Sequence, residues 1–321
     1  MRRALGAVAL FLTVGLFLPG CGGALTGTPI PEGARYRGAL VDHLGKPVKG
    51  PDASMTEQDA ARRIDPCALL DPAAVSALGT VRYSGPGDTL GDCEILIGAD
   101  RTTPVTKVSL SMAVMPVFTG ATTTIGSRTG SEIPGEGLCS IAVAYNDRRA
   151  MNYTAHSDGT GSPCPALRTL VAASVPLLDS PGERAKPLRD PCSFLDVMYP
   201  AEQTFALIAL NPSTCDYSLG PRVRDDHNRY VVRTMTMSKL QLDHPRPGAR
   251  QLRVAGVPAT EYPSGENYCI IDAFAGIDQP YLRPGWGDES EEYVEVLSVS
   301  GRDCEVVRDI TVAAVRTYQA D

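Results

Sequence analysis

The nine cysteines are the residues of this chain best suited to chemistry, since a thiol can form a disulfide, bind a metal ion or carry a lipid. Cys21 stands alone near the start, and the other eight lie between Cys67 and Cys304. A zinc site would favour CxxC or HxxxH spacing and a redox-active pair would favour CxxC, but neither pattern occurs in the sequence. Eight thiols in this arrangement favour four structural disulfides, no metal site and no cofactor.

The opening residues predict export. Arg2 and Arg3 precede an apolar run over residues 4–18, which is shorter than the roughly 20 residues that span a membrane. The pattern Leu18-Pro19-Gly20-Cys21 resembles a lipobox, in which the cysteine is diacylated and becomes the new N-terminus. We therefore expect a lipid, such as palmitate, on Cys21 and a location at the extracytoplasmic face of the cell membrane. The alternative is an ordinary signal peptide with Cys21 in a disulfide, but the odd number of cysteines favours the lipid.

Few other side chains form patterns that could catalyse a reaction. No GxSxG, HExxH, SxxK, Walker or GxGxxG motif occurs. Asp225-Asp226-His227 could hold a cation or transfer protons, but its arginine-rich flanks favour a solvated hairpin tip. The acidic run from Asp288 to Glu295 lacks the spacing of a calcium loop and is interpreted as a charged turn and strand edge. The sequence therefore predicts no catalytic residue and a protein that is not an enzyme.

The single tryptophan lies in a segment with the composition of a recognition surface. Trp286 follows Tyr281, Leu282 and Arg283 within residues 279–287. Tryptophan, tyrosine and arginine dominate many binding surfaces, so Trp286, Tyr281 and Arg283 are the candidate binding residues. The alternative is that Trp286 folds back into the core.

A repeated motif indicates how the chain is organised. Asp65-Pro66-Cys67-Ala68-Leu69-Leu70-Asp71 is nearly repeated as Asp190-Pro191-Cys192-Ser193-Phe194-Leu195-Asp196, and each copy is followed by three more cysteines. About 300 residues after a signal suit two domains. The expected parts are a signal peptide (1–20), the lipidated Cys21 with a flexible tether (21–57), a first DPC module (58–180), a linker (181–188) and a second DPC module (189–321).

Periodicity predicts an α+β fold of two tandem modules, each an antiparallel sheet with a short N-terminal helix and a C-terminal helix packed on it. Asp71-Pro72 begins a helix in the first module. The expected strands there are 93–97, 105–115 and 140–144, and a helix begins at Pro165. The counterparts in the second module are strands at 230–237, 269–271 and 293–299 and a helix over 305–318.

The order of these elements predicts the disulfides. One bridge in each module would join the first helix to the next strand, and the other would join a central strand to the start of the last helix. The expected pairs are Cys67 with Cys93, Cys139 with Cys164, Cys192 with Cys215 and Cys269 with Cys304.

The charge balance argues against one class of partner. The formal net charge is −7, and no basic stripe runs along the chain. Because nucleic-acid binding requires clustered Lys and Arg, we expect no nucleic-acid partner.

These motifs together carry a family resemblance. A lipobox cysteine, a Gly-rich tether and DPCxLL followed by a second cysteine resemble the actinobacterial secreted lipoproteins of the domain of unknown function 3558 family, most clearly over residues 65–98 and 190–220. Ile95 and Tyr217 stand where family members often carry tryptophan, so the chain resembles a divergent tandem pair. The four-cysteine plan is more distantly similar to the extracellular sensor domain of mycobacterial Ser/Thr kinases. The resemblance implies an envelope protein with no catalytic residues to carry over.

The sequence therefore favours a cell-surface lipoprotein that acts as a non-enzymatic binding or sensor module. Its expected partners are the membrane, through Cys21, and a small ligand or an envelope protein. One alternative is a structural or accessory subunit of an envelope complex, and another is a hydrolase.

Overall fold

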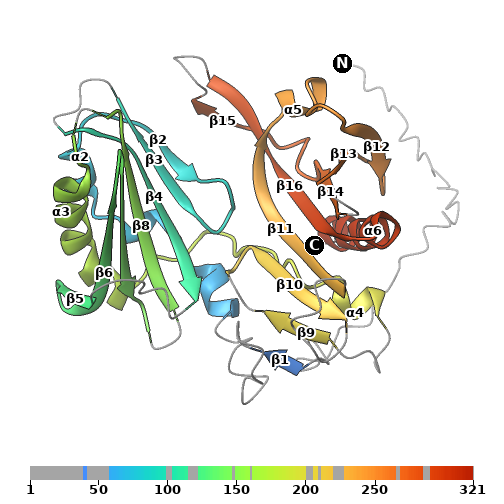
Figure 1. Ribbon diagram of the computed structural model, residues 1–321, viewed down its shortest axis with the longest axis horizontal. Coiled ribbons are helices and arrows are strands. Elements are labelled where there is room, and N and C mark those ends of the chain that lie inside the picture. The colour runs from blue at the N-terminus through green and yellow to red at the C-terminus, as the bar shows by residue number, and fades with distance from the viewer. Residues whose placement is uncertain are drawn as a thin grey trace, which may run out of the picture. The chain divides into compact units, whose positions relative to one another are not determined.

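Two mainly antiparallel sheets organise the chain in the computed structural model (Figure 1). The structure describes residues 39–41, 58–98, 103–114, 122–146, 149–159, 161–199, 205–208, 211–219, 228–264, 268–284 and 290–320. Cys21, Asp225-Asp226-His227 and Trp286 lie outside the described residues, so what was expected of them stays a prediction.

The first sheet has seven strands in the order β2-β3-β4-β8-β7-β6-β5, and all of its pairs are antiparallel. Residues 58–63 are helical and precede the sheet. The strands are β2 (Val81–Pro86), β3 (Cys93–Ile97), β4 (Val105–Val114), β5 (Thr122–Ile125), β6 (Arg128–Gly135), β7 (Leu138–Ala144) and β8 (Arg149–Ser157). The helices are η1 (Cys67–Leu69), α2 (Pro72–Ser76), α3 (Cys164–Ser174) and η2 (Val175–Asp179).

The second sheet has nine strands, eight of them in the order β1-β9-β10-β11-β16-β14-β13-β12, while β15 pairs with β16 off this path. Its strands are β1 (Ala39–Val41), β9 (Phe205–Ile208), β10 (Thr214–Leu219), β11 (Arg229–Ser238), β12 (Arg250–Val254), β13 (Val257–Pro263), β14 (Tyr268–Ala273), β15 (Tyr281–Pro284) and β16 (Ser290–Arg302). The helices are α4 (Leu195–Met198), α5 (Leu240–Asp243) and α6 (Cys304–Ala320).

Strand β1 corrects the expectation of a flexible tether over residues 21–57. Ala39, Leu40 and Val41 pair in parallel with Ala206, Leu207 and Ile208 of β9. Figure 1 shows β1 beside β9, at one edge of the second sheet. A short apolar run can add to a sheet edge wherever that edge leaves backbone groups unpaired. The expectation of a tether is therefore wrong at residues 39–41.

The four disulfides join the expected pairs. They link Cys67 to Cys93, Cys139 to Cys164, Cys192 to Cys215 and Cys269 to Cys304. Each half of the chain therefore has one bridge that ends on β3 or β10 and another that ends at the first residue of α3 or α6. The prediction of four disulfides is confirmed.

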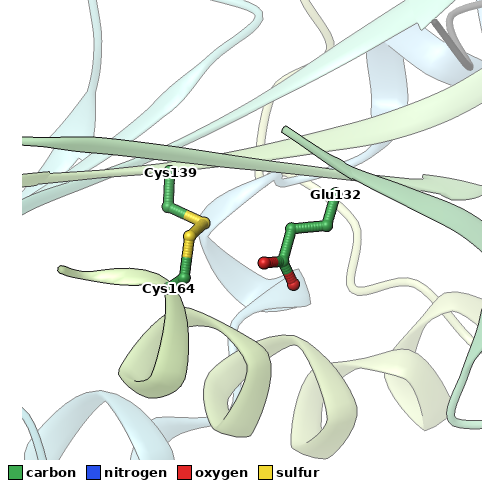
Figure 2. Close-up of side chains that lie close together, drawn as sticks. All are labelled: Glu132, Cys139 and Cys164. Atoms are coloured by element: carbon green, nitrogen blue, oxygen red, sulfur yellow. A yellow bond between two sulfur atoms is a disulfide. The ribbon is translucent and has the colours of Figure 1, made fainter. Parts of the chain in front are cut away.

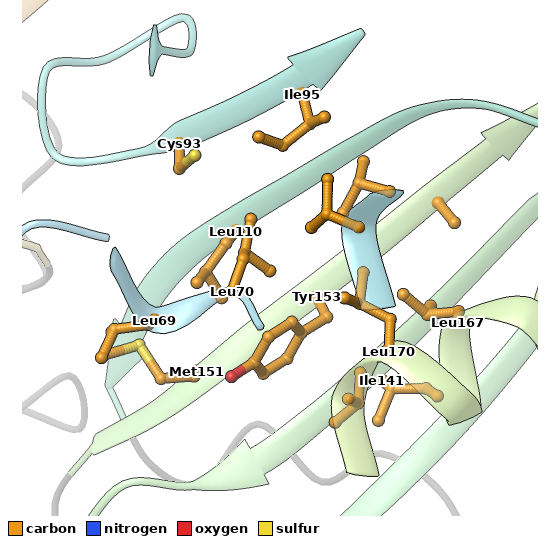
Figure 3. Close-up of a cluster of buried hydrophobic side chains, with 14 of the residues drawn as sticks. Leu69, Leu70, Cys93, Ile95, Leu110, Ile141, Met151, Tyr153, Leu167 and Leu170 are labelled. Atoms are coloured by element: carbon orange, nitrogen blue, oxygen red, sulfur yellow. The ribbon is translucent and has the colours of Figure 1, made fainter. Parts of the chain in front are cut away.

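The core of the first half lies between the sheet and α3. Leu167 and Leu170 of α3 point toward Ile141 and Tyr153 of the sheet, and all four are at most 1% exposed (Figure 3). Ser174, in the last turn of α3, accepts a hydrogen bond from the backbone N–H of Asp71 at 3.0 Å. The side chain of Asp71 in turn accepts from Ala74 N–H at 2.8 Å and caps α2. Helix, cap and sheet therefore form one packed unit.

Residues 181–188, the expected linker, are hydrogen-bonded to residues 62–64 of the first half. Glu183 forms a bridge with Ile64, and Arg184 and Leu188 donate backbone hydrogen bonds to Arg63 and Arg62 at 2.7 and 3.0 Å. Arg62, which is almost fully buried, also lies 3.3 Å from the carboxylate of Asp190. Residues 35–321 accordingly form one compact unit.

Candidate functional site

Strand β15 positions two of the three candidate binding residues. It pairs with the start of β16, so that Tyr281 lies opposite Tyr293 and Arg283 lies opposite Glu291. Alternate side chains of a strand face opposite sides, which separates Leu282 from its two neighbours. Leu282 is 67% exposed, whereas Tyr281 is half-buried and the Arg283 side chain is mostly buried.

Arg283 forms an ion pair with Glu94 of β3, which the sequence did not predict. The side chains of Arg283 and Glu94 are 11% and 3% exposed. Lys107 of β4 adds a second cation, with its Nζ atom 3.4 Å from a carboxylate oxygen of Glu94. Arg283 is therefore bound within the protein, and Leu282 is the most exposed residue of this strand.

Aromatic rings complete this group, which we call the Glu94 cluster and define as Glu94, Lys107, Arg283, Tyr83 and Tyr293. The Arg283 guanidinium lies 4.8 Å from the centroid of the Tyr293 ring and 5.6 Å from that of Tyr83. These distances are within cation–π range. Burial raises the pKa of Tyr83 and Tyr293 above the usual value, so both phenols stay neutral at physiological pH.

The first sheet places a histidine next to this cluster. His156 of β8 lies opposite Lys107 in the register of β4 and β8. Burial and the charge of Lys107 lower the pKa of His156, while Glu94 opposes them. The imidazole is therefore neutral at pH 7 and can donate or accept a hydrogen bond. No spacing in the sequence connects His156 with Glu94, because strand pairing alone brings them together.

A second contact between the two halves lies at the turn from β2 to β3. Leu90 N–H donates to Thr234 C=O at 3.3 Å, and Thr236 N–H donates to Asp88 C=O at 3.1 Å. Thr89 and Met235 form the bridge between these two bonds. The turn therefore adds to the edge of β11, where the pairing with β10 ends at Thr214.

One group of potential metal ligands occurs among the described residues. Glu132, Cys139 and Cys164 place their ligand atoms within 4.8 Å of one another (Figure 2). Both sulfurs belong to a disulfide and are not thiolate ligands. Arg168 donates to both oxygens of Glu132, at 2.6 and 2.7 Å, and these bonds lower the pKa of that carboxyl. This group therefore stabilises the fold between β6, β7 and α3.

The second half contains a small cavity of about 10 Å³, which is room for a single water. Its lining comes from the second DPC motif, the sheet and α6, namely Arg189, Asp190, Pro191, Ser193, Phe194, Thr234, Leu297, Ala314 and Tyr318. A cavity of this size does not hold a lipid or a sugar.

No described helix is long and apolar enough to cross a membrane.

No protein-family model matches the chain, and no curated protein matches it. Among solved structures, the chain was aligned with DynU16, a protein of the dynemicin biosynthetic locus. The sequence identity is 12%, the alignment covers 82% of this chain and 91% of DynU16, and the TM-score is 0.15.

Proposed function

We propose that this protein is a lipid-anchored binding or sensor protein of the bacterial envelope, that it has no enzymatic activity, and that it recognises its partner through the surface around β15. The observation that carries this proposal is the exposure of Leu282, next to the Glu94 cluster and adjoining the segment that contains Trp286. Large apolar side chains held at a fixed position on a surface are typical of recognition sites.

The packing of the core supports recognition at the surface rather than in an internal groove. Tyr153, Leu167 and Leu170 fill the space between α3 and the first sheet, where each is at most 1% exposed. In the second half, the cavity beside Tyr318 has room for one water only. A ligand is therefore proposed to lie on the outside of the fold.

The strand orders support the proposal that the chain is a tandem pair of modules. Counted along the chain, the first sheet has the order 1-2-3-7-6-5-4. In the second sheet, β9 to β14 and β16 lie in the order β9-β10-β11-β16-β14-β13-β12. When these seven strands are numbered 1 to 7 along the chain, this order is also 1-2-3-7-6-5-4. The DPC motifs also agree, since Asp65 accepts a hydrogen bond from Cys67 N–H and Asp190 from Cys192 N–H, both at 3.0 Å. Strand β15 lies outside this shared plan, as expected of an added recognition element.

Four disulfides support a location outside the cytoplasm, because such bonds persist in oxidising compartments. The lipobox-like segment ending at Cys21 and the resemblance to the domain of unknown function 3558 family support the membrane anchor. Nucleic acids are not proposed as partners, because the net charge of −7 would repel their phosphates.

Site-specific photo-crosslinking in the intact envelope tests the proposal. A photoreactive amino acid replaces Leu282 in one variant and Val197 of α4, which is 70% exposed, in the control. We expect a specific crosslink from position 282 that is weakened by Trp286→Ala, and none from position 197. Equal crosslinking at both positions, or none at 282, would contradict the proposal. A crosslinked protein would favour the accessory-subunit alternative, and a crosslinked glycan or lipid would favour a ligand-binding role.

A further inference from the structure

The contact between the β2–β3 turn and β11 depends on a chain of hydroxyl groups that ends at a carboxylate. Ser213 Oγ donates to Thr89 Oγ1 at 3.0 Å, and Thr89 Oγ1 donates to Asp92 Oδ2 at 2.9 Å. The backbone N–H of Asp92 donates to Thr89 C=O at 3.1 Å. Asp92 therefore orients the hydroxyl that Ser213 binds from the second half of the chain.

The backbone bonds of the turn surround this chain of hydroxyl groups. Thr236 Oγ1 donates to Gly87 C=O at 2.6 Å, in addition to its backbone bond with Asp88. Gly87 N–H donates to the carbonyl of Asp92 at 3.2 Å and closes the turn. Asp92 itself is half-buried in this turn, so water solvates its carboxyl less well than it would in an exposed loop.

Two charged groups act on Asp92 in the described part of the chain. Asp88, in the same turn, carries a like charge. Arg184 of the linker carries the opposite charge, and its guanidinium donates to the carbonyls of Ile64 and Leu90. Arg184 also attracts Asp65, so its charge is shared between two carboxylates. From β11 and Ser213 the groups that bind the turn are hydroxyls and backbone.

Burial is the largest effect on Asp92, and it raises the pKa of this carboxyl to about 6, with Asp88 acting in the same direction. The hydrogen bonds from Thr89 and the charge of Arg184 oppose this shift without cancelling it. A carboxyl in a released, solvated turn would have an ordinary pKa of about 3.9. Between about pH 4 and pH 6, Asp92 is therefore protonated in the docked turn and ionised in the released turn.

We propose that the contact between residues 87–92 and β11 is an acid-closed clasp, which tightens when Asp92 is protonated and loosens when it ionises. The proposal does not depend on the proposed function. Since the docked state binds the proton more tightly, acid favours docking. The extra stability of the clasp is fully present below about pH 4 and is lost as the pH rises through about 6. Two pKa units correspond to a change of up to about 100-fold in the docking equilibrium.

Hydrogen exchange of the intact, disulfide-bonded chain tests the clasp. Protection factors of the Leu90 and Thr236 amides, corrected for intrinsic rates, are measured by NMR from pH 4 to pH 7.5. We expect them to fall by up to about 100-fold between about pH 4 and pH 6 and to be nearly constant above that range. In Asp92→Asn, which is always neutral, the protection should stay high at every pH. Glu136→Gln, which removes an exposed carboxylate from another turn, should respond like the wild type.

The carboxyl carbon of Asp92 gives a second measurement that needs no variant. Its NMR titration in the folded wild type is expected to have a midpoint near 6, at the upper end of the pH range over which amide protection is lost. A midpoint near 4 would overturn the proposal. So would pH-independent protection of Leu90 and Thr236 in the wild type, or an unchanged pH response in Asp92→Asn.

Discussion

Arg283 of β15 and Glu94 of β3 form a buried ion pair although they are 189 positions apart in the chain. The pair joins the added strand of the second half to the sheet of the first half. Because both side chains are almost fully desolvated, the pair holds β15 in one position only as long as both charges are present.

Arg283→Met is expected to lower the free energy of unfolding by about 3 kcal/mol, because Glu94 would remain buried and, among the described residues, would keep Lys107 alone as an ion-pair partner. Urea unfolding of the intact chain measures this change. The added substitution Glu94→Gln should recover much of the loss, since it removes the unpaired charge. Arg250→Ala is the matched control, because Arg250 is 62% exposed and its ion pair with Glu261 should contribute less than about 1 kcal/mol. Equal losses for both arginines would contradict the prediction.

The bridges of the two DPC motifs should contribute similar stability. Cys67 and Cys93 are 26 positions apart, and Cys192 and Cys215 are 23 positions apart. Loops of similar length restrict the unfolded chain to a similar degree, so changing either pair to serine should cost roughly 2–5 kcal/mol. Chemical unfolding of the full chain measures both values. A loss below about 1 kcal/mol for either pair would contradict the prediction that its bridge stabilises the fold.

Glu261 should make the second half more stable at neutral pH than in acid. Arg308 of α6 donates two hydrogen bonds to this carboxylate, at 2.6 and 2.9 Å, and they lower the pKa of Glu261, with Arg250 acting in the same direction. A lowered folded pKa contributes stability above the unfolded pKa, and this stability is lost as the pH falls through the folded pKa. The melting temperature of Glu261→Gln should therefore lie below that of the wild type at pH 7, and the difference should shrink toward pH 3. A difference that is the same at both pH values would contradict this linkage.

Lipidation predicts a simple fractionation result. Cys21→Ser should move the protein from the membrane fraction to the soluble extracytoplasmic fraction, because the lipid attaches through the sulfur of Cys21. Gly23→Ala leaves the thiol in place and should remain in the membrane fraction. Membrane retention of Cys21→Ser would rule out this anchor.

Features with local signals could be predicted from the sequence. Alternation of apolar and polar residues predicted β4, β11 and β16, and helical spacing predicted α3 and α6. The order of the expected helices and strands, repeated in both halves, predicted which cysteines pair. Strand β8 carries a similar signal in Met151, Tyr153 and Ala155, which are all buried, and it could have been predicted on the same grounds.

Features that depend on long-range pairing could not be predicted. The exposed strand β5 reads Thr-Thr-Thr-Ile, which has no clear apolar face, and the short strand β1 owes its structure to β9. Composition singled out Arg283 but not its partner Glu94, because only the folded chain brings β15 to β3. The position of Asp92 in the clasp likewise depends on how the turn packs on β11.

The turn at Asp88, Thr89 and Leu90 also has a consequence for handling pieces of this protein. It occupies backbone groups of Thr234 and Thr236 that would otherwise form an open strand edge. Open edges recruit strands from neighbouring chains and promote aggregation. A fragment that begins after the linker would lack this turn, so the edge of β11 at Thr234 and Thr236 would be open. If such a fragment self-associates, the cause would be this open edge and not a failure of the second sheet to fold.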